Sequence, residues 1–352
     1  MKAKRPVPSD DPDLPAGDAG LPDEGDLWFL PGPAEDEPGD PLAPATAQPL
    51  ESPVLADWAR AEAGCAARLA RVAWRLGALD ERLRRGPEGW RHRLALIEAA
   101  ELSWFAGDRV GPDRLALWMS LRLSGAGDDS AALARVGGAA RRLTGGPGPQ
   151  ADLAAFLDRR DPEAVAADTE PFADRAGAWL DLMGAGQGLH PVTRACMGFH
   201  LWSLAGMGQQ GDRMEAAVTA ARIAAAEAKG LIFAPLAMGG TSALRVGGKP
   251  DERLLRWLDG METACQTAMR QLDDVEAWGT RAAAAMAGLS GRTPPALRKA
   301  LADWPLISAP MAEALSGSSR AAVQRNLAWM EERGLIREVT GQGRFRMWRI
   351  AI

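Results

Sequence analysis

The chain has 352 residues, of which 41 are Lys or Arg and 46 are Asp or Glu, giving a formal net charge of −5. Its length allows two or three domains, and its content of 47% hydrophobic residues is ordinary for a soluble protein. It contains no apolar run of about eighteen residues and no apolar segment behind its basic N-terminus. The sequence therefore predicts no membrane span and no secretory signal. We expect a cytoplasmic location.

Residues 1–50 are rich in Pro, Asp, Glu and Gly and poor in apolar side chains. Such a segment cannot bury enough surface to offset the entropy of the chain, so we expect a disordered acidic tail. One apolar island interrupts it, from Asp26 to Leu30. The island is either a docking strand for a partner protein or a loosely packed patch on the chain's own helical part.

Residues 51–290 repeat apolar positions three and four residues apart, with Ala in the interiors and Gly-rich joints between segments. Strand-like runs are lacking, which favours an all-α bundle. The expected helices span residues 54–83, 89–105, 112–123, 130–143, 150–157, 162–183, 191–204, 213–229 and 251–289. The last helix carries a wide apolar stripe, which predicts packing on more than one neighbour, within the bundle or in a homodimer: Leu254, Leu255, Leu258, Met261, Cys265 and Met269.

A Gly- and Pro-rich segment at residues 291–295 is predicted to be a hinge to a C-terminal domain, residues 291–352. In that domain Ser308 and Pro310 predict the start of a short helix over residues 309–315. A hydroxyl side chain can cap the first turn, and a proline there loses no hydrogen bond.

A longer helix is predicted over residues 318–333, ending at Gly334. Strands at 335–340 and 345–350 then surround a Gly-rich turn and form a hairpin, whose tip is the predicted wing at residues 341–346. Two helices joined by a tight turn and followed by a hairpin indicate a winged helix-turn-helix, an arrangement that binds DNA.

The charge of the C-terminal residues agrees with this interpretation. From Leu297 on, nine Arg and Lys stand against five acids, so this segment carries +4 and the residues before it −9. A basic module on an acidic chain is typical of a protein whose one end meets phosphate groups. Val323, Leu327 and Met330 share one helix face, so the opposite face is predicted to contact DNA. The predicted contacts are Ser319, Arg320, Ala321, Gln324 and Arg325 on the helix, and Arg344 and Arg346 at the wing.

An alternative is that the winged module contacts protein rather than DNA. Trp329 and Trp348 are then candidates for the contact surface. The arginines favour DNA, because they lie on the second helix and the wing instead of being scattered.

The sequence carries no pattern that indicates catalysis, a metal or a cofactor. The histidines and cysteines lack the spacing of metal ligands, and neither a GxSxG nucleophile elbow nor a GxxxxGK[ST] phosphate loop is present. His190 is interpreted as a helix-start residue that is hydrogen-bonded locally. The three histidines are His92, His190 and His200, and the three cysteines are Cys65, Cys196 and Cys265.

Two resemblances add to these patterns. The layout, with Leu-Asp-Glu-Arg-Leu at residues 79–83 and a C-terminal helix-turn-helix, resembles an uncharacterised bacterial family that is best populated in rhizobia and their relatives. Its members pair an α-helical domain of unknown function with a helix-turn-helix DNA-binding domain. The resemblance covers most of residues 55–352 and implies this architecture without an activity.

More distantly, the layout is similar to Fic-domain proteins, which often end in a winged helix. Residues 98–110 have the shape of the inhibitory helix of that family, with Ala106 where the inhibitory glutamate would stand. His190-Pro191 matches the start of the signature HPFxxGNGR, but the residues that follow contain no Gly-Asn-Gly-Arg. Those residues bind phosphate in the family, so the resemblance implies a degenerate Fic-like scaffold without transferase activity.

The sequence thus predicts a mainly α protein, a helical bundle followed by a winged helix-turn-helix, that binds double-stranded DNA and regulates transcription. It is expected to form a homodimer and to bind a small-molecule or protein effector on the helical domain. The alternatives are a Fic-like nucleotidyl transferase with His190 as its base, and a non-enzymatic interaction protein.

Overall fold

The chain from residue 49 onward forms one compact unit. The predicted tail over residues 1–50, with its apolar island, lies outside the described residues. The computed structural model describes residues 51–121, 129–159, 172–207, 213–341 and 345–352.

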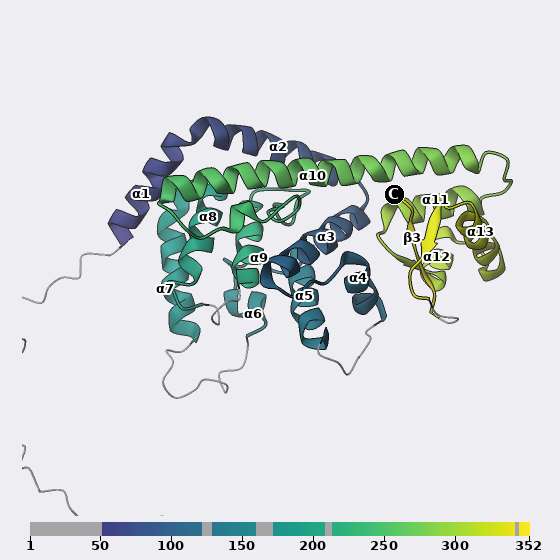
Figure 1. The fold of residues 1–352 in the computed structure, drawn as a ribbon, viewed down its shortest axis with the longest axis horizontal. Helices are drawn as coiled ribbons and strands as arrows, with labels where there is room; N and C mark the ends of the chain where they lie inside the picture. Colours follow the sequence, from purple (N-terminus) through teal and green to yellow (C-terminus); the bar gives the residue numbers. More distant parts are fainter. Residues whose placement is uncertain (1–50, 122–128, 160–171, 208–212, 342–344) are drawn as a thin grey trace, which may run out of the picture. The chain divides into compact units, whose positions relative to one another are not determined.

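Helices dominate the described residues, as the sequence predicts (Figure 1). No helix among them is both long enough and apolar enough to span a membrane. The elements before residue 290 are α1 (Glu51–Gly64), α2 (Ala66–Arg85), α3 (Glu88–Ala106), α4 (Pro112–Leu121), α5 (Asp129–Thr144), α6 (Leu153–Leu157), α7 (Phe172–Ala185), η3 (Gly186–Gly188), α8 (Pro191–Trp202), α9 (Arg213–Ala224), η4 (Ser242–Leu244) and α10 (Pro250–Ala285).

Some predicted boundaries were wrong. The helix expected over 54–83 is interrupted at Cys65, where the backbone leaves the helical conformation. The apolar spacing continues across this residue, so the sequence pattern does not show the break. The helix expected over 150–157 starts only at Leu153, since the Asp152 side chain accepts the N–H of Ala155 and caps it there. The helix expected over 213–229 ends at Ala224.

Helix α10 contacts elements from both the part of the chain before residue 290 and the part after it. It contacts α1, α2, α3, α8 and η4, and towards its C-terminal end α11 (Thr293–Asp303), as Figure 1 shows. The predicted stripe on α10 is used for these contacts: Leu254, Leu258 and Met261 are fully buried, whereas Leu255 remains 42% exposed. Most of the stripe therefore packs within the chain.

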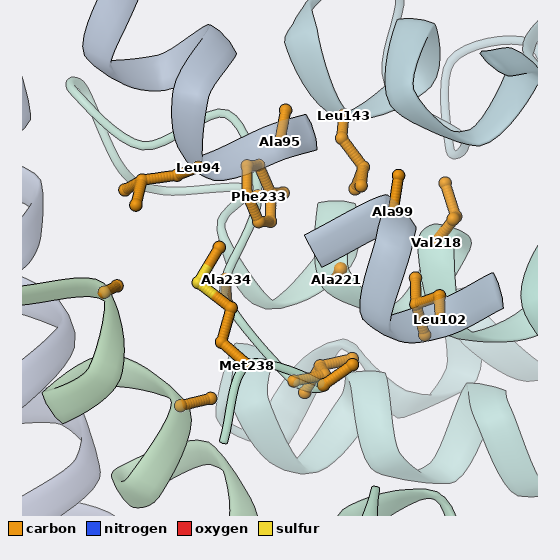
Figure 2. Close-up of a cluster of buried hydrophobic side chains, with 14 of the residues drawn as sticks. Leu94, Ala95, Ala99, Leu102, Leu143, Val218, Ala221, Phe233, Ala234 and Met238 are labelled. Carbon is orange, nitrogen blue, oxygen red and sulfur yellow. The ribbon is translucent and has the colours of Figure 1, made fainter. Parts of the chain in front are cut away.

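A second packing centre lies where α3, α5 and α9 meet the irregular segment after α9. Figure 2 shows this cluster, to which the loop contributes buried side chains beside those of the helices. Its members are Leu94, Ala95, Ala99 and Leu102 of α3, Leu143 of α5, Val218 and Ala221 of α9, and Phe233, Ala234 and Met238 of the loop.

Two carboxylates satisfy the backbone of this buried loop. Glu98 of α3 is inaccessible to solvent and accepts the N–H groups of Leu236 (2.8 Å), Ala237 (2.8 Å) and Met238 (3.1 Å). Asp80 of α2 accepts the N–H groups of residues 229–231 in the same way. A loop inside a protein needs such partners, because unpaired backbone N–H groups are costly to bury.

The C-terminal module, defined as residues 293–352, contains both helices and strands. Its elements are α11 (Thr293–Asp303), β1 (Ile307–Ser308), α12 (Ala309–Ser316), α13 (Arg320–Glu332), β2 (Ile336–Glu338) and β3 (Met347–Ile350). The strands form one antiparallel sheet in the order β1-β3-β2, with Ile336 opposite Ile350 and Ile307 opposite Trp348.

The module differs from the sequence prediction at its start and in its sheet. The segment Thr293–Pro295 was predicted to be a hinge but opens α11, since proline is well tolerated in the first turn of a helix. The hairpin is present with shorter strands than the predicted 335–340 and 345–350. The short strand β1 was not predicted. Whether residues 51–290 and 291–352 act as separate domains stays a prediction.

Candidate nucleic-acid interface

The turn between α12 and α13 is set by local capping. Ser308 caps α12 by accepting the N–H of Met311, and Gly317 ends α12 in the left-handed region at φ 59°. Ser319 accepts the N–H of Ala322 and caps α13. The Ser318 hydroxyl lies 3.0 Å from the Thr293 hydroxyl on α11. These bonds fix the angle at which α13 leaves the turn.

The buried face of α13 is the predicted one. Val323 and Met330 are fully buried and Leu327 is 1% exposed, so this face packs on α11, α12 and β2. The opposite face is open to solvent. It presents the predicted residues Ser319, Arg320, Ala321, Gln324 and Arg325, and also Ala328.

The exposed face has a chemistry suited to nucleic acid. Ala321 and Ala328 have short side chains, so another molecule can approach the helix backbone closely at this face. Arg320, Gln324 and Arg325 supply donors that hydrogen-bond phosphate or base edges. Ser319 has its hydroxyl oxygen engaged in the cap, so its main role here is to start the helix.

The wing residues differ in how they are placed. Arg344 falls outside the described residues. Arg346 is exposed but ion-paired, because its Nη2 lies 3.0 Å from the Glu331 carboxylate of α13. Its guanidinium also lies over the Trp348 ring, 5.1 Å from the centroid. Phosphate would have to compete with Glu331 for Arg346.

The turn before the predicted wing is held by Glu338. Its carboxylate accepts the N–H of Thr340 (2.8 Å) and of Gly341 (3.0 Å) and binds the Thr340 hydroxyl. Burial opposes ionisation of this carboxyl, but these hydrogen bonds outweigh it and the pKa of Glu338 is lowered. An ionised Glu338 therefore shapes the base of the hairpin.

Phe345 is a surface residue that the sequence prediction missed. Its side chain is 74% exposed and its φ of 59° is in the left-handed region, where aromatic residues are rare. The signal that could have found it is an aromatic residue between two arginines directly after a Gly-rich turn.

The two tryptophans named for a protein-contact surface differ in burial. Trp348 is 5% exposed and its indole N–H donates to Glu331 (3.2 Å). Trp329 is half-buried, and the Arg333 guanidinium stacks 3.9 Å from its ring centroid. The prediction that Trp348 lies at a surface was wrong, because its ring belongs to the core of the sheet.

The three histidines lie outside the C-terminal module, in the part of the chain before residue 290. His190 caps α8: its Nδ1 accepts the N–H of Val192 (3.2 Å), and its own backbone N–H donates to Glu62 (3.0 Å). The prediction of a locally bonded helix-start residue is therefore confirmed. Burial lowers the pKa of His190 and, more strongly, lowers that of His200 to about 3. Among the described residues no group of His, Cys, Asp and Glu has the geometry of a metal site.

No protein-family model matches the chain, and no curated protein matches it. The solved structure of a Fic family protein from Desulfovibrio desulfuricans G20 is similar, with 13% sequence identity and a TM-score of 0.36. The similarity covers 87% of this chain and 97% of that chain. At this TM-score the likeness assigns neither a fold nor an activity.

Proposed function

We propose that the chain binds double-stranded DNA through the C-terminal module and regulates transcription, with α13 in the major groove and the hairpin after it as a wing. The observation that carries the proposal is the exposed face of α13, where Arg320, Gln324 and Arg325 stand beside the small residues Ala321 and Ala328. The order of helices and strands in the module supports the winged helix-turn-helix interpretation.

The proposal includes a homodimer. A single winged module contributes only a fraction of the interface of a specific complex, so a second copy is needed for useful affinity. Most of the apolar stripe of α10 is buried in the chain, so we place the dimer contact on another surface.

The test is DNA binding by the full chain, measured as fluorescence anisotropy with DNA from upstream of its own gene and with unrelated DNA. Arg325→Ala should weaken binding to the specific fragment by about 1–3 kcal/mol, the usual contribution of a good base contact. Arg344→Ala should weaken binding to all sequences alike.

Arg60→Ala is a matched control, since it removes the same charge from α1, where the side chain is 76% exposed. It should leave both DNA affinities unchanged. If Arg325→Ala and Arg344→Ala bind as the parent does, at low and at physiological salt, the module does not recognise DNA.

A further inference from the structure

A cavity of about 220 Å³ lies where the C-terminal module meets the helical region. Residues of α3, α4 and α10 line one side, and residues of the segment before β1 and of β3 line the other. A space of this size has room for a small organic molecule.

Most of the cavity wall is apolar. A ligand with a hydrocarbon body gains free energy there by leaving water, at about 25 cal/mol for each Å² of apolar surface buried. The apolar lining residues include Leu96 and Ile97 of α3, Ala116 of α4, Leu306 before β1, and Ile350 of β3.

Two arginines from different parts of the chain line the same cavity. Arg93 of α3 is only 7% exposed, and its Nη2 donates to the carbonyl oxygens of Trp304 (2.8 Å) and Leu301 (3.5 Å). Its Nε has no hydrogen-bond partner among the described residues. Arg349 of β3 is the second arginine, and its Nε also lacks a partner within the described part of the chain.

The positive charge of this cavity is only partly compensated. Asp113 of α4 pairs with Arg349 at 3.3 Å, which leaves one acid against two arginines among the lining residues. Burial and the charge of Arg349 lower the pKa of Arg93 to about 10, so Arg93 is still protonated at neutral pH. Arg337 lies directly opposite Arg349 across β2 and β3 and adds positive charge nearby. Two guanidinium groups beside a single carboxylate favour a second anion next to them.

We propose that this cavity binds a small organic carboxylate with a short apolar body. The carboxylate would lie beside the guanidinium groups of Arg93 and Arg349, and the body would fill the space between α3, α4 and the sheet. This binding rests on the cavity alone and not on the proposed DNA recognition. Since the cavity joins the helical region to the module, its occupant is placed to act as the effector of the protein.

The test is isothermal titration calorimetry on the full chain with hexanoate and benzoate, each compared with its neutral isostere, hexanamide and benzamide. At least one carboxylate should bind at least about tenfold more tightly than its amide, since hydrogen bonds to charged groups are worth that much or more. Equal affinities for carboxylate and amide, or no binding of either carboxylate at millimolar concentration, would overturn the proposal.

Variants of opposite sign separate a ligand contact from a merely structural role. Arg349→Gln should weaken carboxylate binding about tenfold or more. Asp113→Asn removes the acid that competes for Arg349, so it should tighten carboxylate binding and leave amide binding unchanged. Arg93→Gln should also weaken binding, and its thermal unfolding is measured beside it because Arg93 also holds the Trp304 carbonyl.

Arg325→Ala is the control that keeps the two proposals apart, because Arg325 is exposed on α13 and does not line the cavity. It should bind the carboxylate as the parent does even where it has lost DNA affinity. Loss of carboxylate binding in Arg325→Ala, or unchanged binding in both Arg349→Gln and Asp113→Asn, would overturn the assignment of the cavity.

Discussion

The indole N–H of Trp278 on α10 donates a hydrogen bond of 2.7 Å to the carbonyl oxygen of Leu335 in the C-terminal module. The Trp278 side chain is fully buried, and the same carbonyl also accepts the N–H of Ala351. The Trp90 indole likewise donates to the carbonyl of Ala302, from α3 to α11. Buried polar contacts thus hold the module to the helical region, in addition to the apolar packing of α10 and α11.

Trp278→Phe should lower the free energy of unfolding by about 1–3 kcal/mol. It removes one hydrogen bond, worth about 1 kcal/mol, and leaves part of the indole volume empty. Urea unfolding of the full chain measures the change. Trp74→Phe is the control, because Trp74 is 66% exposed, and it should change stability by less than about 0.5 kcal/mol. Equal losses in the two variants would show that the Leu335 contact adds nothing.

The parts of the fold that the sequence predicted are those set by local rules. Ser308, Pro310 and Ser319 mark helix starts by chemistry that acts within one turn, and Val323 and Leu327 mark a face by spacing alone. The buried and exposed sides of α13 followed from these signals.

The parts that it did not predict depend on distant partners or on very short elements. Strand β1 has two residues, too few to show a period, and forms because β3 pairs with it. Glu98 lies 138 to 140 positions from the N–H groups it accepts, so its role could not be seen in its neighbours. The cavity with Arg93 and Arg349 likewise joins residues from opposite ends of the chain.

The contribution of Glu98 to stability should fall as pH rises from 4.5 to 7, whereas that of His200, whose pKa burial lowers, changes in the opposite direction. Burial raises the pKa of this carboxyl to about 7, from 4.5 in the unfolded chain. Below pH 4.5 both states hold the proton, and above pH 7 neither does. Between these values only the folded state holds it, so the Glu98 contribution to stability falls with each rise in pH, by up to about 3 kcal/mol in total.

Glu98→Gln isolates this effect, since the amide does not titrate. The loss of stability that Glu98→Gln causes at pH 4.5 comes from the NH2 group that it places near the loop N–H groups. Relative to the parent, this loss should shrink by up to about 3 kcal/mol towards pH 7. Urea unfolding at several pH values measures the difference. Asp274→Asn, an exposed site on α10, should show no such trend. A cost of Glu98→Gln that is independent of pH contradicts the prediction.

The chain should transfer no AMP to itself or to candidate proteins when incubated with ATP and magnesium. The residues after His190-Pro191 contain no Gly-Asn-Gly-Arg to bind phosphate. His190 itself uses its Nδ1 to hold the N–H of Val192. Radiolabelled ATP provides the measurement. Label that is incorporated by the parent and lost in His190→Ala would instead support the Fic-like alternative.

Releasing Arg346 from Glu331 should strengthen DNA binding if the wing meets phosphate. Glu331→Gln removes the charge that holds the Arg346 guanidinium, so affinity for all DNA sequences should rise about two- to fivefold at low salt and less at high salt. Glu332→Gln is the matched control, because it deletes the same charge one residue away, where the exposed side chain makes no ion pair within the described residues. Anisotropy titrations at two salt concentrations compare the variants. An equal gain in both would mean that the gain comes from net charge alone, and that Arg346 stays on α13 when DNA is bound.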